Sequence, residues 1–207
     1  MPFYATYVGH IKNGVFETWD ECRAEIHKKP KYKKFATREE AERFNREGPF
    51  SKPLGDFDVT VYTDGACRNN GKLNAVAGYG IYFGTPDDPR NTSVQLTGKA
   101  TNNIAELTAV LKTIQILAND LKAGKRCVIY TDSKYAIFCC GSYGQKCEKK
   151  KWPADIPNLE LVRETYTLAK QYPDTLAFVH VAAHTEATDV HSVGNSNADR
   201  LATHAIG

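Results

Sequence analysis

The stretch Asp58-Val59-Thr60-Val61-Tyr62-Thr63-Asp64-Gly65-Ala66-Cys67 is the part of the chain around which the fold is organised. Its β-branched and aromatic residues predict a β-strand. Asp64-Gly65 is a turn signal, so we expect the strand to stop there with a carboxylate at its end. A plain hairpin or loop aspartate is the commoner meaning of Thr-Asp-Gly taken alone, and the rest of the chain decides between the two.

A second strand, predicted over 126–131, also ends in Tyr-Thr-Asp, at Asp132. Between the two strands, apolar residues recur every three or four positions and predict a helix over 103–122, with Glu106 in its first turns. A strand-helix-strand unit favours a parallel pair, which would place Asp64 and Asp132 side by side. Adjacent carboxylates repel each other, and a divalent cation such as Mg²⁺ or Mn²⁺ relieves that repulsion. For Glu106 alone, pairing with the helix dipole is an equally simple interpretation.

The remaining elements of this half are strands over 77–83, 93–97 and 176–181 and helices over 157–172 and 195–205. The first two of these strands form an antiparallel meander with the opening one. Asp199 lies near the start of the last helix, where an aspartate often compensates the helix dipole. His184, just beyond the last strand, is a candidate proton carrier or a simple loop histidine.

The first 48 residues predict a smaller unit in the order strand, strand, helix, short strand, helix. Thr18 with Glu21, and Thr37 with Glu40, are capping boxes that mark the two helix starts. Between positions 22 and 38 basic residues greatly outnumber acidic ones, and aromatic residues interrupt them. Such a segment can hold phosphates and sugars. A solvated basic loop over a small aromatic core is the alternative.

Composition limits the classes that the chain can join. Its 207 residues carry a net charge of only +3, so nucleic-acid binding must come from local clusters of basic residues. No apolar run is long enough to span a membrane, and the N-terminus lacks the pattern of a signal peptide. The six cysteines include no Cys-x-x-Cys pair, which favours reduced thiols over a zinc site. We therefore expect an intracellular protein, in the nucleus or the cytoplasm, with a monomer as the default.

Gly and Pro residues punctuate a linker at 48–56. We expect a domain at 1–47, this linker, and a second domain at 57–207. The first domain resembles the hybrid-binding domain of eukaryotic-type ribonucleases H, in Thr18-Trp19-Asp20-Glu21-Cys22 and in Tyr32-Lys33-Lys34-Phe35-Ala36-Thr37-Arg38-Glu39-Glu40-Ala41. The resemblance implies an RNA·DNA hybrid as the partner, with double-stranded RNA as a second ligand of this domain. It assigns the sugar-phosphate grip to Trp19 and Tyr32, and phosphate contacts to Lys28, Lys33 and Lys34.

The second domain resembles the catalytic domain of type 1 ribonuclease H. The resemblance rests on motifs that occur in one order: Thr63-Asp64-Gly65, Thr101-Asn102-Asn103-Ile104-Ala105-Glu106-Leu107, Tyr130-Thr131-Asp132-Ser133, Val181-Ala182-Ala183-His184 and Gly194-Asn195-Ser196-Asn197-Ala198-Asp199-Arg200-Leu201-Ala202. The implied fold is α/β, a five-stranded mixed sheet flanked by helices, preceded by the small α+β hybrid-binding domain.

The resemblance also implies a reaction. Family members hydrolyse the RNA strand of an RNA·DNA hybrid with two metal ions and leave 5′-phosphate and 3′-hydroxyl ends. Matching positions assign two Mg²⁺ ions, with Mn²⁺ as a substitute, to Asp64, Glu106, Asp132 and Asp199. His184 matches a histidine that assists proton transfer or product release.

Substrate contacts follow from the same resemblance. The implied minor-groove residues are Asn70, Asn102, Asn103 and Glu106, the implied DNA-phosphate pocket is Lys99, Thr101 and Asn158, and the implied channel aromatics are Tyr135 and Tyr143. The basic segment at 146–152 resembles a protrusion that grips the hybrid, with a solvated lysine-rich turn as the alternative.

The segment between His184 and Gly194 is longer than is usual in the family. We expect it to form a mobile loop, in which His191 competes with His184. A hybrid-binding module without activity, the ribonuclease H part of a polyprotein, and a DNA-cutting resolvase or integrase are the rivals. The four carboxylates argue against the first and the asparagine cluster against the last. A hybrid-binding domain directly after the N-terminus, and an end at Gly207, favour a stand-alone enzyme.

Overall fold

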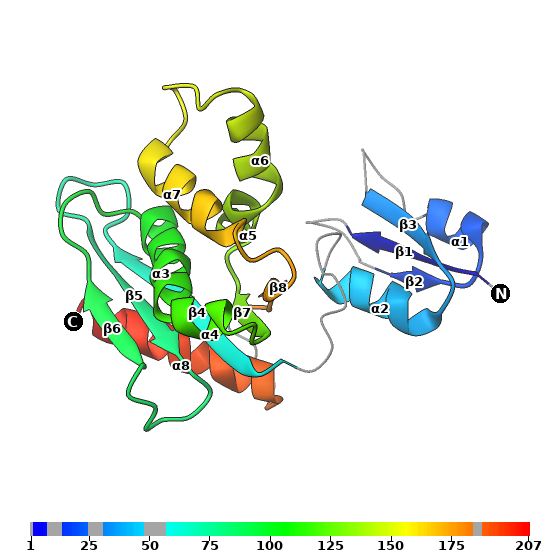
Figure 1. Cartoon of the computed structure of the whole chain (residues 1–207), viewed down its shortest axis with the longest axis horizontal. Coiled ribbons are helices and arrows are strands. Elements are labelled where there is room, and N and C mark those ends of the chain that lie inside the picture. The colour runs from blue at the N-terminus through cyan, green and yellow to red at the C-terminus, as the bar shows by residue number, and fades with distance from the viewer. Residues whose placement is uncertain (1, 8–13, 25–30, 48–56, 184–187) are drawn as a thin grey trace. The chain divides into compact units, whose positions relative to one another are not determined.

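The computed structural model describes residues 2–7, 14–24, 31–47, 57–183 and 188–207 (Figure 1). The chain divides into two compact units, Met1–Pro53 and Leu54–Gly207. The predicted linker at 48–56 lies outside the described residues.

The first unit is a three-stranded antiparallel sheet with two helices. Its elements are β1 (Phe3–Tyr7), β2 (Val15–Phe16), α1 (Trp19–Ala24), β3 (Lys31–Phe35) and α2 (Arg38–Glu47), and the strand order is β2-β1-β3. This order of elements confirms the sequence prediction. Both capping boxes are present, because the Thr18 and Glu21 side chains accept each other's backbone N–H, as do those of Thr37 and Glu40.

The second unit is built on the predicted five-stranded mixed sheet. Its strands are β4 (Val59–Arg68), β5 (Val76–Tyr82), β6 (Thr92–Gln95), β7 (Cys127–Thr131) and β8 (Leu176–His180), in the order β6-β5-β4-β7-β8. β4, β7 and β8 pair in parallel, whereas β4-β5 and β5-β6 are antiparallel. The central position of β4 places its residues between the two kinds of pairing.

Helices cover both faces of this sheet (Figure 1). They are α3 (Asn102–Ile116), α4 (Ala118–Lys122), α5 (Lys134–Cys140), α6 (Ser142–Lys149), α7 (Leu159–Ala169) and α8 (Val190–His204). A Cβ on Gly65 would lie 2.8 Å from Cα of Glu106 in α3, while a Cβ on Gly80 would lie 2.8 Å from Cβ of Leu201 in α8. Gly80 pairs with Asp64, so the side chain of Asp64 faces α8 and Gly65 faces α3.

The strand that opens the unit does not stop at Asp64, as its turn signal predicted. β4 continues to Arg68 because residues 62–68 pair with β5 in one antiparallel ladder. Gly65 serves the close approach of α3 to the sheet rather than a turn. Asp64 therefore projects from the middle of a strand, which holds its backbone more rigidly than a loop would.

Two other boundaries also differ from the prediction. The expected helix over 103–122 is divided at Leu117 into α3 and α4. α8 begins at Val190 and not at Asn195, because Asp189 caps it by accepting the N–H of His191 and of Ser192. The prediction of a mobile loop is thus wrong for 190–193, and Asp199 lies well inside α8 rather than near its start.

Within the described part of the chain, no helix is long and apolar enough to cross a membrane. All six cysteines are free thiols, and all but Cys67 are buried.

Candidate active site

The ends of the parallel pairing between β4 and β7 bring two aspartates together. Thr63 is the residue paired with Thr131 at the end of this ladder, so Asp64 and Asp132 follow from matched positions on neighbouring strands. This register confirms the predicted parallel pair. Asp64 is only 8% exposed, which makes it a buried carboxyl group beside a second one.

The pKa of Asp64 reflects its burial and the nearby carboxylates. Burial, followed by the negative charges of Asp132 and Asp199, raises the pKa of Asp64 to about 8, although a hydrogen bond from the Gly65 backbone opposes the rise. Asp64 also shares a side-chain hydrogen bond with Asp199, which favours its protonated form. Without a cation, the raised pKa therefore favours the protonated form of Asp64 at neutral pH.

Glu106 enters the site from the second turn of α3. Thr101 caps this helix by accepting the N–H of Ile104. The Glu106 carboxylate accepts the Asn102 amide at 2.6 Å and also the Ser133 hydroxyl. Burial raises the pKa of Glu106, the bonds from Ser133 and Asn102 oppose that rise, and the charge of Asp132 adds to it. Ser133 in turn caps α5, so the two helices are joined through this carboxylate.

Two residues that the sequence prediction missed hold Asp132. Asn195 in α8 is 4% exposed, and its Nδ2 lies 3.5 Å from Oδ2 of Asp132, the length of a weak hydrogen bond. Oδ1 of Asn195 is buried and has no hydrogen-bond partner among the residues that the structure describes. His180, at the end of β8, has Nε2 3.1 Å from the backbone carbonyl of Asp132. Burial lowers the pKa of His180, so its neutral form is the donor.

The donor set fits a divalent metal ion by its chemistry. Asp64, Glu106, Asp132 and Asp199 supply only oxygen, and their crowding raises a pKa that a cation would lower. The carboxylates approach one another in pairs. Among the described residues, no group of three or more His, Cys, Asp or Glu side chains is already arranged around one metal position. His184, the predicted proton carrier, lies outside the described residues.

Predicted substrate residues beside α3 gather in part. Oδ1 of Asn70, in the turn after β4, accepts the backbone N–H of Asn102 at 3.3 Å. Asn102 therefore joins Asn70 to the Glu106 carboxylate. Asn103 and Lys99 are exposed. These side chains lie at the N-terminal end of α3, where a helix favours anionic groups.

The predicted channel aromatics line a hollow on α5 and α6. It has a volume of about 480 Å³ and is lined by Tyr135, Phe138, Ser142, Tyr143 and Lys146. The Tyr135 hydroxyl is bonded to Nδ2 of Asn158 at 3.3 Å. The structure thus brings Asn158 to a channel residue, and its grouping with Lys99 and Thr101 stays a prediction.

The basic segment at 146–152 is held from one side. Glu148 accepts hydrogen bonds from the Tyr166 hydroxyl, at 3.1 Å, and from Lys170. Lys151 and Trp152 both adopt positive φ, and the Trp152 ring lies 5.9 Å from that of Tyr166. Glu148, the acidic residue within this lysine-rich segment, is therefore bonded to α7 and its end and not to the described lysines beside it. Lys149 and Lys150 are exposed to solvent.

In the first unit the predicted aromatic pair is assembled. The rings of Trp19 and Tyr32 are 5.0 Å apart, and Tyr4 extends the cluster at 5.7 Å from Trp19. Tyr32 is 53% exposed, and Lys33 and Lys34 on the same strand are exposed as well. Lys28 lies outside the described residues.

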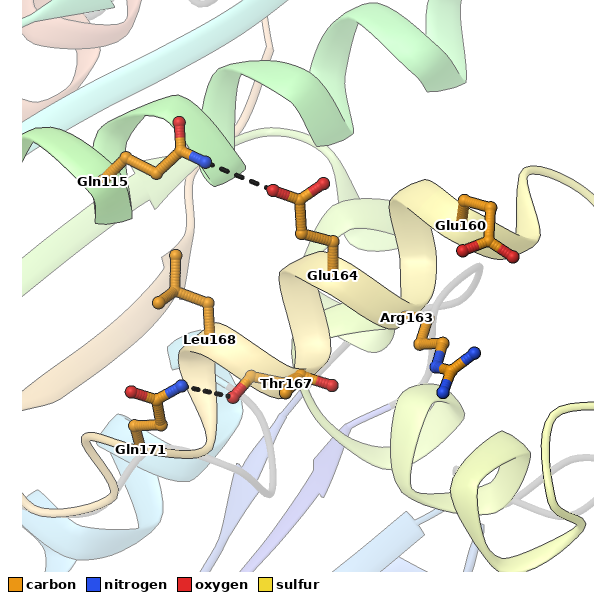
Figure 2. A pocket seen from close by; sticks show the side chains of 7 residues that line it. All are labelled: Gln115, Glu160, Arg163, Glu164, Thr167, Leu168 and Gln171. Atoms are coloured by element: carbon orange, nitrogen blue, oxygen red, sulfur yellow. Dashed lines mark hydrogen bonds between the residues drawn. The ribbon is translucent and has the colours of Figure 1, made fainter.

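A second hollow of about 560 Å³ lies between the end of α3 and α7. Figure 2 shows Gln115 of α3 bonded to Glu164 of α7 across it. Its lining residues are Gln115, Glu160, Arg163, Glu164, Thr167, Leu168 and Gln171, and none of them is a predicted site residue. Two glutamates against one arginine give it the wrong charge for a phosphate backbone.

Comparison with known proteins agrees with this arrangement. The family model described as RNase H matches residues 56–207, and the model described as Ribonuclease H1 N-terminal domain matches residues 2–45. The chain belongs to the ribonuclease H family, and so it is an enzyme of the nuclease class. Its similarity extends to Ribonuclease H1 of Homo sapiens, which is 30% identical over 97% of this chain and 87% of the human protein. Ribonuclease H of Schizosaccharomyces pombe is 36% identical over 69% of this chain and 50% of the yeast protein.

Solved structures share the fold of the second unit. The RNase H domain of PFV superposes with a TM-score of 0.59 at 23% identity, over 75% of this chain and 98% of that domain. LC9-RNase H1 gives a TM-score of 0.55 at 23% identity, over 72% of each chain. A foamy viral protease-reverse transcriptase, solved in complex with an RNA/DNA hybrid, gives 0.59 at 20% identity, over 75% of this chain and 21% of that one.

Proposed function

We propose that this protein is an endonuclease that hydrolyses the RNA strand of RNA·DNA hybrids and leaves 5′-phosphate and 3′-hydroxyl ends. The observation that carries the proposal is the matched position of Asp64 and Asp132 at the end of the parallel pairing of β4 and β7, with Asp199 and Glu106 close enough to act on their charges. Such a concentration of carboxyl groups around a buried aspartate costs stability unless a cation joins it. Relatives that match 97% of this chain carry the name Ribonuclease H1.

The metal ions are the finer part of the proposal. Asp64, Glu106, Asp132 and Asp199 would hold two Mg²⁺ ions, with Mn²⁺ as a substitute. Two bound ions supply activation of the attacking water and stabilisation of the departing 3′ oxygen. The chain's own contribution is to keep the four carboxylates oriented: Asn102 and Ser133 hold Glu106, while Asn195 and His180 hold Asp132. We assign to His184 the transfer of a proton or the release of product.

The substrate contacts support RNA as the strand that is cut. Ribose 2′-hydroxyls line the minor groove of an A-form duplex, and amide side chains can both donate to them and accept from them. Asn102 donates to Glu106 and its backbone N–H donates to Asn70, while Asn103 is the next residue along α3. These three asparagines are our candidates for this contact. For the DNA strand we propose phosphate contacts by Lys99, Thr101 and Asn158, and a channel along Tyr135 and Tyr143.

In the first unit, we propose that Trp19 and Tyr32 stack on the sugar-phosphate backbone while Lys28, Lys33 and Lys34 hold phosphates. The match of residues 2–45 to the model described as Ribonuclease H1 N-terminal domain supports a hybrid as the partner of this unit. Double-stranded RNA is a second ligand that we propose for this unit alone. We further propose that the protein acts as a monomer in the nucleus or the cytoplasm.

The test is cleavage of an end-labelled RNA·DNA hybrid in Mg²⁺ beside RNA·RNA and DNA·DNA duplexes of the same sequence. We expect cleavage of the hybrid's RNA only, with a 5′-phosphate on the downstream product. Asp132→Asn should abolish it, and Asp87→Asn, at an exposed loop position, should not. Tight hybrid binding without cleavage by the wild-type protein would leave the rival, a binding module, as the correct assignment.

A further inference from the structure

The first turn of α8 is the part of the second unit that the family resemblance does not account for. This turn is built from the segment before Gly194, which is longer than usual in the family. Asp189 caps its N-terminal end. The Asp189 carboxylate accepts the N–H of His191 at 3.0 Å, the N–H of Ser192 at 3.1 Å and the Ser192 hydroxyl at 2.6 Å. This turn is therefore an ordered extension of the helix that carries Asp199.

His191 fixes the extension to the sheet through two tyrosines. Its Nδ1 lies 3.1 Å from the hydroxyl of Tyr62 in β4. Its ring stacks on that of Tyr130 in β7, with centroids 4.2 Å apart and planes inclined by 25°. Tyr62 is 2% exposed, and burial followed by the charges of neighbouring groups raises its pKa to about 12, so the phenol keeps its proton. These contacts engage both the polar edge and the face of the imidazole.

The two tyrosines occupy equivalent positions. Tyr62 stands two residues before Asp64 and Tyr130 two residues before Asp132, and Tyr62 and Tyr130 pair in the parallel ladder. Residues two apart in a strand point to the same face of the sheet. His191 therefore touches the strand that contains Asp64, on the face to which Asp64 points, and the strand that ends directly before Asp132.

The other end of the connection is the helix itself. His191, Asn195 and Asp199 follow one another at four-residue intervals, so they lie along one face of α8. α8 lies directly on the strands, since a Cβ on Gly194 would come 2.5 Å from Cε2 of Tyr62. Asn195 reaches Asp132 and Asp199 reaches Asp64. Small sideways or rotational shifts of α8 would move both contacts at once.

We propose that His191 is a positioning residue: by joining Tyr62 and Tyr130, it sets the place of α8 so that Asn195 and Asp199 meet Asp132 and Asp64. This inference rests on the proposed function, because the purpose of that placement is the carboxylate site. It assigns His191 a different task from the proton transfer that we propose for His184. It also gives the added turn a purpose, which is to provide a third contact along the helix beyond the two at the site.

The experiment compares His191→Ala, His191→Phe and Tyr62→Phe with the wild-type chain, and uses His204→Ala, an exposed histidine at the far end of the same helix, as the matched control. His191→Phe keeps an aromatic ring for Tyr130 and loses the bond, while Tyr62→Phe loses the same bond from the other side. Single-turnover cleavage in saturating Mg²⁺ measures the chemical step, and hybrid binding in EDTA measures affinity. Amide hydrogen exchange of residues 194–199 in the metal-free protein measures the seating of α8 without any turnover.

We expect His191→Ala to lower the single-turnover rate on the order of tenfold, as for other residues that orient metal ligands, with hybrid affinity unchanged. His191→Phe and Tyr62→Phe should each lower it by a smaller factor. The double variant that combines His191→Phe with Tyr62→Phe should lose no more than either single variant, because both remove the same hydrogen bond. Exchange at 194–199 should quicken in every variant but His204→Ala.

Several results would overturn the proposal. The proposal would be wrong if both His191 variants cleaved the hybrid as fast as an active wild-type protein. It would also be wrong if the single-turnover rate of the double variant fell by the product of the factors measured for His191→Phe and Tyr62→Phe. Exchange at 194–199 that does not change in any His191 or Tyr62 variant would also overturn it, whatever the activities. A wild-type protein that does not cleave is a separate result, since it removes the proposed function while exchange still tests the seating of the helix.

Discussion

Replacing Asp64 by asparagine should stabilise the metal-free protein while it abolishes cleavage. Asparagine keeps the size of the side chain and cannot ionise. In the wild-type protein, the pKa of Asp64 is raised from 3.8 to about 8 in the native state, chiefly by burial and by Asp132. The native state therefore holds one proton more than the unfolded state between about pH 4 and pH 8, and its stability falls as pH rises through that window.

The size of the effect follows from the width of the window. Each pH unit is worth about 1.4 kcal/mol, so the three units between the unfolded pKa and pH 7 amount to an upper limit of about 4 kcal/mol. We expect Asp64→Asn to be more stable at pH 7 by about 2–4 kcal/mol. The difference in the free energy of unfolding should shrink by about 1.4 kcal/mol for each pH unit toward pH 5. The reason is that the cost of keeping Asp64 protonated in the wild-type native state falls as the pH approaches the unfolded pKa.

The assay is urea unfolding in EDTA at pH 5, 6, 7 and 8. The chain has two tryptophans, Trp19 in the first unit and Trp152 in the second, so a Trp19→Phe background makes fluorescence report on the second unit alone. Asp87→Asn serves as the control, with no pH-dependent gain expected at an exposed site. Equal stability of the wild-type and Asp64→Asn proteins at every pH would refute the crowding of carboxylates described above.

Two further predictions concern packing and binding. Gly65→Ala should destabilise the second unit by about 3 kcal/mol, as overpacking against backbone does, because its Cβ would lie 2.7 Å from the carbonyl carbon of Ala105 and displace α3 with Glu106. Thermal unfolding checks it against Gly141→Ala, whose Cβ would have an ordinary 3.5 Å contact, and an equal loss in both would contradict the reasoning. Lys34→Ala should lower the slope of log affinity for a hybrid against log salt by about one, the value for a lost phosphate contact. Binding titrations in EDTA over a KCl series measure that slope, and a slope that changes as little as in Lys122→Ala would contradict a phosphate contact at Lys34.

The sheet and its paired aspartates could be predicted because they follow from short-range patterns. The repeated Tyr-Thr-Asp at Asp64 and Asp132 marks two strands, and the helix between them restricts those strands to a parallel pair. The end of β4 could not be predicted in the same way. The local turn signal at Asp64-Gly65 was outweighed by pairing with β5, a partner that no window of ten residues contains.

The supporting residues were missed for a different reason. Asn195 and His180 act through contacts between elements far apart in the chain, and neither residue type indicates such a contact. His191 was predicted only as a loop residue that competes with His184, and not as a contact of the sheet. The start of α8 was misplaced as well, since Asp189 is an ordinary capping residue that appears meaningful only once the helix is known. The four-residue spacing from His191 to Asn195 to Asp199 was the available signal.

The matched ladder of β4 and β7 makes cleavage a measure of correct folding. If β7 paired one residue out of step, Asp132 would project from the opposite face and could not reach Asp64. Misfolded molecules with a shifted sheet could be compact and contain the same secondary structure, yet they would not cleave the hybrid. After refolding, the fraction of full specific activity therefore counts the molecules in which these two strands found their proper alignment, which circular dichroism alone would not distinguish.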